Sequence, residues 1–296
     1  MSWSVRSYRL GMVSVLVVGA VVLGLVVVLV GVRMVRDRQH AALGTSLVGS
    51  ARPIEGPVDL SSELAGLPDP VWRYFETVLA DGQPYVRSAV LHQTGEFRMD
   101  EDGSWHPFTA TQWVAVDPPG FVWDATIEMA PFVSARVVDA YHHGTGFLRA
   151  RLLGLVTVAE PEPGPDLDEG ELMRYLAEAV WVPTALLPAS GVAWRSVDDH
   201  TAAAKLSHAG TTVSLLFSFD EQGLVERVST DARPRDVDGT AVPTPWTGTF
   251  EDYERRDGML VPTAGEVAWS LSEGEHPYWR GSIDRFEYSM PDERTG

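Results

Sequence analysis

Three ionisable side chains occupy positions where the sequence otherwise predicts apolar surroundings. Asp139 continues the inward-facing alternation of a strand ending near Tyr141, and Arg174 and Glu178 share the narrow polar wedge of an apolar helix. A buried charge without a partner is costly, or the group loses its charge. We therefore predict a structural clamp in which Arg174 contacts Glu178, Asp139 or both. The alternative is that Asp139 is held there for general acid–base catalysis.

The catalytic alternative joins Asp139 to His142 and His143, an adjacent histidine pair next to Gly144. Neighbouring residues of a strand point to opposite faces, so one metal ion would rarely bind both histidines, and a turn explains them without chemistry. The spacings HExxH, GxSxG, the P-loop and a helix-opening GxGxxG are absent. The sequence predicts no metal and no cofactor. As an enzyme, the protein would be a hydrolase of lipid-like substrates.

The chain contains ten tryptophans, and many of them fall in or beside predicted strands and the predicted central helix. As core residues they need no further role. They could equally line a cavity for an apolar ligand, because such pockets are mostly aromatic with few polar groups. The candidate ligand-binding residues are Trp113, Phe121, Trp123, Trp181 and Phe217.

Arg174 and Glu178 are positioned by a predicted central helix over residues 169–188. Apolar residues cover most of its helical wheel, and Glu171 joins the two ionisable residues in the remaining wedge. A surface helix has a single apolar stripe, so a helix that is apolar nearly all round must be enclosed. Pro183 should end its first segment.

The rest of the chain reads as strands. Apolar and polar residues alternate over 121–129 and 212–219, and Asp-Gly or Gln-Gly turns separate a dozen strand-like segments, which indicates antiparallel pairing. So many twisted strands must curl or split. The predicted fold class is mainly β with α (α+β), a curved antiparallel sheet or half-barrel wrapped on the central helix. The predicted helix-facing residues are Phe121, Trp123, Ile127, Leu215 and Phe217, and the predicted outward residues are Asp124, Glu128 and Ser214.

An uncharged apolar run extends from Leu10 to Val32. As a helix it would span ~35 Å, more than the ~30 Å hydrocarbon core of a bilayer. Arginines, not a small-residue cleavage site, follow it, so we predict an uncleaved single-pass transmembrane helix and a membrane as partner. The predicted organisation is a transmembrane anchor with basic flanks over 1–40, a Gly/Ser/Pro-rich linker over 41–68, and one antiparallel β-rich domain over 69–290.

Charge and cysteine content exclude several function classes. The chain has a net charge of −18 at pH 7, although its first forty residues carry five arginines against Asp37. So acidic a body repels phosphate backbones, and we expect no nucleic-acid partner. The absence of cysteine excludes disulfides, thiolate catalysis and cysteine-ligated metals.

Two resemblances accompany these patterns. The motifs Asp117-Pro118-Pro119-Gly120-Phe121-Val122-Trp123, Arg174-Tyr175-Leu176-Ala177-Glu178, Trp181 to Pro188 and Pro243-Thr244-Pro245-Trp246 resemble a bacterial membrane-associated family of unknown function. The passage Asp252-Tyr253, Asp257-Gly258-Met259 and Val261-Pro262-Thr263 is similar to lipoprotein-carrier folds. That second resemblance implies a curved antiparallel half-barrel closed by helices around an apolar cavity.

The most favoured function is therefore a non-catalytic, membrane-anchored module that binds or handles an apolar ligand such as a lipid. The alternatives are the lipid-directed hydrolase and a structural or protein-interaction domain with a filled core. We expect the protein at the cell membrane. The arginines on the two sides of the apolar run nearly balance, so charge does not decide the orientation in the membrane. The carrier resemblance alone implies that the body lies outside the cytoplasm.

Overall fold

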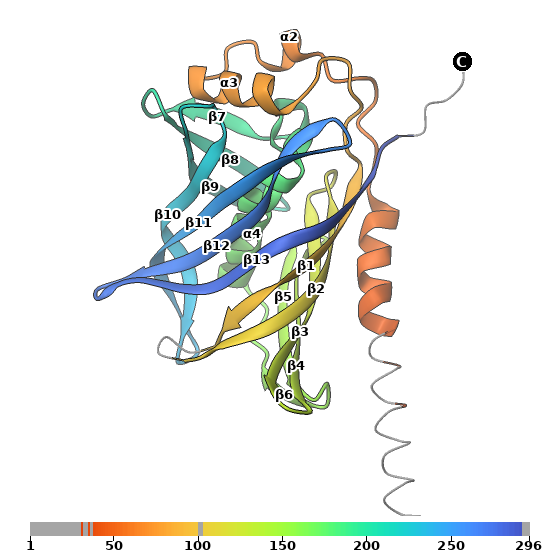
Figure 1. Cartoon of the computed structure of the whole chain (residues 1–296), viewed down its shortest axis with the longest axis vertical. Helices are drawn as coiled ribbons and strands as arrows, with labels where there is room; N and C mark the ends of the chain where they lie inside the picture. The colour runs from red at the N-terminus through yellow and green to blue at the C-terminus, as the bar shows by residue number, and fades with distance from the viewer. Residues whose placement is uncertain (1–30, 32–34, 36–37, 100–102, 292–296) are drawn as a thin grey trace, which may run out of the picture. The chain divides into compact units, whose positions relative to one another are not determined.

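The computed structural model describes residues 31, 35, 38–99 and 103–291. In the described part of the chain, thirteen strands form a single antiparallel sheet, and a few helices accompany them (Figure 1). In chain order the elements are α2 (Leu60–Glu63), α3 (Asp69–Val78), β1 (Ser88–Arg98), β2 (Trp105–Ala115), β3 (Gly120–Ala130), β4 (Val133–His142), β5 (Thr145–Leu152), β6 (Val156–Ala159), α4 (Pro165–Glu178), three 3-10 turns η1 (Ala179–Trp181), η2 (Pro183–Leu186) and η3 (Pro188–Ser190), β7 (Ala193–Ser196), β8 (Thr201–His208), β9 (Thr211–Phe219), β10 (Val225–Val237), β11 (Thr240–Arg256), β12 (Met259–Leu271) and β13 (Gly274–Ser289).

The strand order is β6-β5-β4-β3-β2-β1-β13-β12-β11-β10-β9-β8-β7. Every neighbouring pair is antiparallel, and all but β1 with β13 are consecutive in the chain. The two edges, β6 and β7, are joined in sequence by α4 and the 3-10 turns. The segment that leaves one edge therefore crosses the concave side of the sheet before it starts the other edge.

The accumulated twist of the sheet brings its two limbs together. Neighbouring strands rotate by roughly 20–25° each, so the rotation accumulated over the nine steps from β4 to β8 is about half a turn. The β4–β5 turn accordingly abuts the β8–β9 turn, where a Cβ on Gly144 would lie 2.3 Å from that of Ala209. The Tyr141 hydroxyl and His208 Nδ1 lie 3.0 Å apart, which links β4 to β8. The curled half-barrel predicted from the alternating pattern is confirmed.

A row of glycines lets the middle of the sheet bend. Gly95 on β1, Gly281 on β13 and Gly265 on β12 are successive register partners on the inner face. The rings of Phe108 and Trp279 lie over this row, within 3.2 Å of where glycine Cβ atoms would be. Removing side chains here allows close approach of backbone and aromatic ring, which is how glycines shape curved sheets.

Helix α4 fills the concavity (Figure 1). It contacts β3, β4 and β5 on one limb and β9 and β10 on the other. Seven consecutive or near-consecutive residues are buried around its circumference: Gly170, Glu171, Leu172, Met173, Tyr175, Leu176 and Ala177. The enclosed helix is thus as predicted, but its bounds differ from 169–188. It starts at Pro165, favoured at a first helical position, and after Glu178 the chain continues as 3-10 turns because prolines interrupt it.

The strand register matches the predicted faces. Phe121, Trp123, Ile127, Leu215 and Phe217 are all at most 2% exposed and belong to the main core. Glu128 and Ser214 are exposed. Asp124 points outward yet is covered, because it forms an ion pair with Arg136 of the neighbouring strand.

Residues 41–68 are not the linker that their composition predicts. Residues 38–50 are helical, and Leu47 and Ala51 pack on the outer face of β3 and β4 against Val122 and Ala140. Gly44 lies directly on the Trp113 ring, and Val58 and Leu64 enter the main core. The cause is a four-residue apolar spacing (Leu43, Leu47, Ala51) that places these side chains on one helix face. The body therefore begins near Leu43.

The predicted transmembrane segment, residues 10–32, lies outside the described residues apart from Gly31. Among the helices that the structure does describe, none is long and apolar enough to cross a membrane.

The glycine row generates a stability prediction. A Cβ on residue 95 would lie 2.2 Å from the carbonyl oxygen of Arg280, a backbone atom that cannot move aside. Gly95→Ala should destabilise the protein by about 1–3 kcal/mol or more, as overpacking does. The control is Gly49→Ala, in a helix with nothing within 4 Å of the added carbon, which should be neutral or stabilising by up to ~1 kcal/mol. Thermal unfolding of both variants measures this, and equal melting temperatures would contradict the role of Gly95.

Candidate functional site

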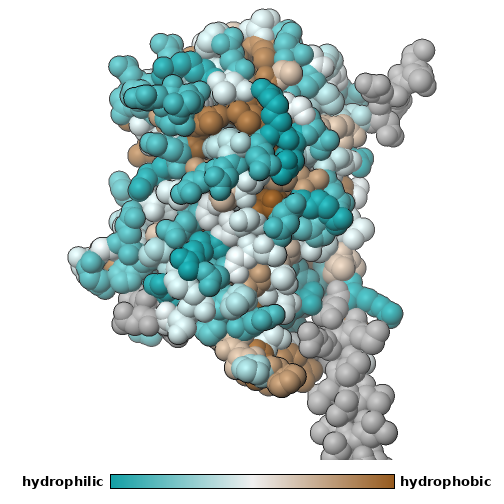
Figure 2. All heavy atoms as spheres, viewed as in Figure 1, coloured by the Kyte–Doolittle hydropathy of each residue, from teal (hydrophilic) through white to brown (hydrophobic). Residues whose placement is uncertain are grey.

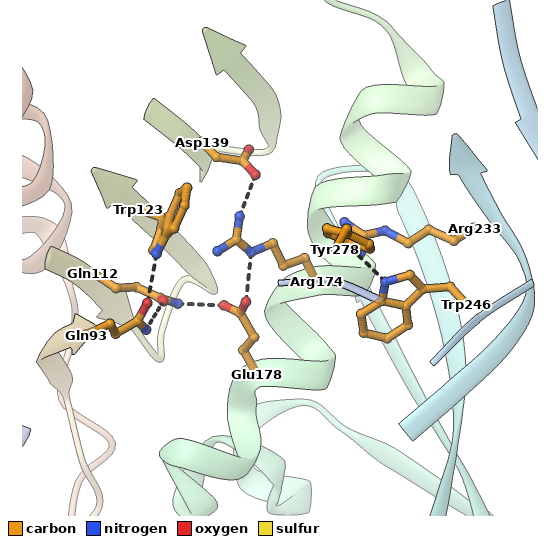
Figure 3. A network of polar contacts seen from close by, with 9 residues as sticks. All are labelled: Gln93, Gln112, Trp123, Asp139, Arg174, Glu178, Arg233, Trp246 and Tyr278. Atoms are coloured by element: carbon orange, nitrogen blue, oxygen red, sulfur yellow. Dashed lines mark hydrogen bonds and ion pairs between the residues drawn. The ribbon is translucent and has the colours of Figure 1, made fainter. Parts of the chain in front are cut away.

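The polar site of the interior is centred on Arg174, which projects from α4 toward β4 (Figure 3). Its Nη1 donates to Asp139 Oδ2 at 2.5 Å and its Nε donates to Glu178 Oε1 at 2.8 Å. The three side chains are between 9% and 18% exposed. Arg174 thus contacts both carboxylates, as the clamp prediction required.

A chain of side-chain amides continues from Glu178 across the sheet (Figure 3). Gln112 Nε2 donates to Glu178 Oε2 at 2.6 Å, Gln93 Nε2 donates to Gln112 Oε1 at 2.8 Å, and Trp123 Nε1 donates to Gln93 Oε1 at 2.8 Å. An indole can only donate and a carboxylate can only accept, so the two ends fix the orientation of both amides between them. The network joins β1, β2 and β3 to α4.

Two aromatic side chains of β3 complete the surroundings of Arg174. Its guanidinium carbon lies 4.8 Å from the ring centre of Phe121 and 5.1 Å from that of Trp123. Burial alone would lower the pKa of Arg174, but the charges of Glu178 and Asp139 outweigh burial and raise it. Arg174 is therefore a permanent cation held by carboxylates and ring faces.

Glu171 is a fourth ionisable group at this site, one helical turn before Arg174. Burial raises its pKa well above 4.5, and the charge of Asp139 raises it further, against the opposing effect of Arg233 and Arg174. Glu171 Oε2 and Asp139 Oδ1 are both buried and have no other hydrogen-bond partner among the described residues, and a hydrogen bond between the two side chains adds to the rise in the pKa of Glu171. A proton kept on Glu171 and donated to Asp139 satisfies both oxygens at once.

Arg233 of β10 provides the second interior cation. It is 8% exposed, lies 4.9 Å from the ring centre of Trp246 and donates to the Tyr278 hydroxyl at 3.5 Å. Trp246 Nε1 donates to the same hydroxyl at 2.9 Å (Figure 3). With Glu171 neutral, Arg174 and Arg233 balance the charges of Asp139 and Glu178.

The five aromatic candidates do not form one pocket. Phe121 and Trp123 surround Arg174, whereas Trp181 packs on Phe250 and Trp279 at ring-centre distances of 6.0 and 6.2 Å. Phe217 belongs to a third group with Trp194. Trp113 lies on the outer face beneath Gly44, because it occupies an odd position in a strand whose even positions face inward.

The histidine pair lies at the end of β4, separated from the clamp. His143 has a left-handed φ of 53° in the turn before Gly144, the turn placement expected, and its ring centre lies 4.1 Å from that of His142. Burial and the neighbouring His143 lower the pKa of His142. Asp139 binds Arg174 instead of a histidine. In the described part of the chain no group of three metal-ligating side chains comes together.

Four residues of the site were not predicted. Gln93 and Gln112 fall on the inward alternation of their strands, between Leu91 and Gly95 and between Ala110 and Val114, so a polar residue at an inward position was the available signal. Glu171 was placed in the helix wedge without a role. Arg233 carries no such signal, since β10 shows no regular alternation of buried and exposed residues and its approach to α4 depends on the curl of the sheet.

The fold and site define a class: an antiparallel half-barrel filled by a helix that a buried ion network ties to the sheet. The chain belongs to a family of unknown function, DUF6920, whose model matches residues 65–288. The resemblance to a family of unknown function is thereby confirmed. No curated protein matches the chain.

Several solved structures are similar to this fold. One is a DUF1329 family protein from Desulfovibrio piger, with TM-score 0.40 and 10% identity over 78% of this chain and 94% of that one. Another is a putative outer membrane lipoprotein-sorting protein domain from Vibrio parahaemolyticus, with TM-score 0.35 and 8% identity over 70% and 87%. A third is a LolA superfamily protein from Nitrosomonas europaea, with TM-score 0.34 and 11% identity over 79% and 96%.

The clamp generates the first prediction about the site. Arg174→Met should destabilise the protein by about 3–5 kcal/mol, because Asp139 and Glu178 are left buried without their counter-ion. Arg227→Met is the matched control. Its pairing with Glu275 is exposed at 3.4 Å, and such surface pairs contribute ~0–1 kcal/mol. Chemical denaturation measures both. Asp139→Asn combined with Arg174→Met should cost less than the sum of the two, whereas strict additivity would contradict their coupling.

Glu171 generates a prediction about pH. The unfolded chain loses this proton near 4.5 and the folded chain keeps it, so the unfolded state binds fewer protons above that pH. The free energy of unfolding therefore falls as pH rises from 4.5 toward the raised pKa, by up to about 1.4 kcal/mol per pH unit. Glu171→Gln should remove this fall, and its stability relative to the original protein should grow with pH. Glu162→Gln, at an exposed position, should not. A pH-independent difference for Glu171→Gln would contradict a neutral Glu171.

Proposed function

We propose that the protein is a membrane-anchored, non-catalytic module that binds an apolar ligand such as a lipid on the concave side of its half-barrel. The ligand lies against the aromatic group that joins η1 to the middle of the sheet. This group comprises Trp181, Trp279, Phe250 and Phe108. Catalysis is not favoured, because Asp139, the carboxylate considered for acid–base chemistry, is engaged by Arg174 instead of a histidine.

The observation that carries the proposal is a pair of buried indole donors. Trp181 Nε1 and Trp279 Nε1 are buried and have no hydrogen-bond partner among the described residues. The two rings are neighbours, with their centres 6.2 Å apart. A buried N–H without an acceptor is costly, and tryptophan usually finds one. An ester carbonyl attached to an acyl chain supplies an acceptor in apolar surroundings. The pair therefore favours an apolar ligand that carries a carbonyl group.

In this proposal the ligand enters by displacing the 3-10 turns. In this structure protein side chains fill the concave side, so an acyl chain takes space now held by residues 179–190. Short 3-10 turns have poor hydrogen-bond geometry and often mark hinges. Each of η1, η2 and η3 is three or four residues long, whereas the clamp keeps α4 fixed. Displacement of the turns therefore leaves the ion network intact.

Residues 10–32 form the transmembrane anchor in this proposal, and the body lies at the membrane surface on the extracytoplasmic side. The length and apolarity of that run support the anchor. A C-terminal fusion settles the side. Alkaline phosphatase should be active there, and a fluorescent cytoplasmic fusion would contradict the assignment.

Ligand binding is tested with a phospholipid whose acyl chain carries a diazirine. The full chain is photolysed with this lipid, and cross-linked peptides are mapped by mass spectrometry. Peptides containing Trp181 or Trp279 should be labelled. Trp279→Phe keeps an aromatic ring, although a smaller one, but removes the indole donor, and should reduce interior labelling several-fold.

The control variant is Trp72→Phe, on the exposed face of α3, which should leave interior labelling unchanged. Labelling confined to surface peptides and to residues 10–32 would contradict the proposal and leave a structural or interaction domain with a filled core.

A further inference from the structure

Apolar side chains are exposed at one end of the half-barrel. Phe132, in the β3–β4 turn, is 102% exposed, and Val156, on edge strand β6, is 62% exposed. Leu153 in the β5–β6 turn and Val158 on β6 are exposed as well. These four residues are the hydrophobic tip. Figure 2 shows apolar surface gathered at the end of the molecule where Figure 1 labels β6.

The register of the sheet places the two turns side by side. Ala130 pairs with Val133, so Phe132 lies at the end of that hairpin. Ala135 pairs with Leu152, and Leu153 N donates to the Ser134 carbonyl at 2.7 Å. Phe132 and Leu153 therefore project from adjacent hairpins at the same end of the sheet.

Phe132 and Leu153 each combine an unfavourable backbone conformation with an exposed apolar side chain. Phe132 has a φ of 65° and Leu153 a φ of 52°, a left-handed conformation that bulky residues rarely adopt. Among the residues that the structure describes, the other non-glycine residues with positive φ are His143, Ala209, Asp238, Asp252 and Asp257, mostly types that tolerate this conformation better. Glycine or asparagine would relieve the strain and interact better with water. Stability in water therefore does not account for a phenylalanine and a leucine in these turns.

The helix that precedes residue 51 runs alongside β3, and its direction relates the start of the body to the hydrophobic tip. Arg52 N donates to the Asp117 carbonyl before β3 begins, and Gly44 lies against Trp113, the register partner of Val122 within β3. Followed from residue 52 back to residue 44, the helix advances in the direction in which β3 runs to Ala130. The N-terminal end of this helix, where the body begins, thus faces the end of the sheet that carries the hydrophobic tip.

Little chain separates the body from the proposed anchor. Residues 33–42 are the ten between Val32 and Leu43, and they span ~15 Å as a helix or ~35 Å fully extended. A body tied so closely to a bilayer brings its nearest end to the lipid surface. An exposed apolar patch in that position is the feature of a membrane-contacting surface.

We propose that the hydrophobic tip inserts into the interfacial layer of the same bilayer that holds residues 10–32. The tip then fixes the orientation of the half-barrel on the membrane, independently of any lipid bound inside. This inference rests on the proposed anchor.

The absence of cysteine allows single labels at chosen positions. Phe132→Cys and Val156→Cys are labelled with the fluorophore NBD in the full chain, reconstituted in phosphatidylcholine vesicles that contain doxyl-labelled phosphatidylcholine. Both tip labels should shift to shorter wavelength, and the doxyl lipid should quench them at least twofold. Asp257→Cys, an exposed turn residue with a similar φ of 46°, and Trp72→Cys, an exposed apolar site on α3, are the controls. Labels at these two positions should remain aqueous and unquenched.

A paired variant separates membrane contact from folding. Phe132→Asn combined with Leu153→Asn suits the left-handed turns and should leave the melting temperature equal or higher. It should return the Val156→Cys label to an aqueous spectrum. Unchanged quenching in this variant would overturn the role of the two turn residues.

The remaining outcomes are distinct. Failure of the chain to float with vesicles overturns both the anchor and the tip. Flotation with aqueous tip labels, or with quenching as strong at the control positions, overturns the tip alone. A blue-shifted tip label that doxyl lipid does not quench indicates contact with a second copy through β6, and also overturns the proposal.

Discussion

A guanidinium enclosed by a β-sheet must be surrounded by acceptors, and much of this interior follows from that requirement. Arg174 holds Asp139 of β4 and Glu178 of its own helix, and Glu178 orients the two glutamines that end at Trp123. One charge therefore fixes the rotation of α4 and its height along three strands. Buried ion networks are weak contributors to net stability but effective determinants of a single arrangement. In a half-barrel whose edges are unpaired, that specificity defines which face of the helix meets which limb.

Much of this arrangement could be predicted from local pattern. Period-two alternation assigned Phe121 and Trp123 to the inner face, and an apolar helix with one wedge identified Arg174. The features that the sequence did not predict depend on long-range geometry. The approach of Arg233 to α4 requires the sheet to curl, and no periodicity encodes curl. The linker interpretation of 41–68 gave too much weight to glycine and serine content, and too little to a four-residue apolar spacing. Val122, apolar on the supposedly wet face, was the unused signal that a second layer covers β3.

The same strands are therefore buried on both sides over part of their length. Helix α4 covers the inner face of β3 and β4, and the helix around Leu47 covers the outer face near Val122 and Ala140. Such a three-layer region is stiff, while the limb formed by β7 to β10 has one covered face. In the proposed function the stiff limb carries the ion network. The 3-10 turns, of which η1 packs on the middle of the sheet, are then the part free to rearrange around a ligand.

The pairing of β1 with β13 has a consequence for how the chain folds. Ser88 is the register partner of Ser289, and Arg87 N donates to the Ser289 carbonyl, so the centre of the sheet joins residues about two hundred positions apart in the sequence. Contacts of such sequence separation form slowly because a long loop must first be closed. During synthesis, β1 to β6 and β7 to β12 can each form hairpins, but neither half has its final neighbour until the last strand emerges. An unfinished chain therefore exposes two long strand edges, those of β1 and β12, without their final neighbour. Its biogenesis depends on preventing wrong pairing of these edges until the C-terminal strand is made.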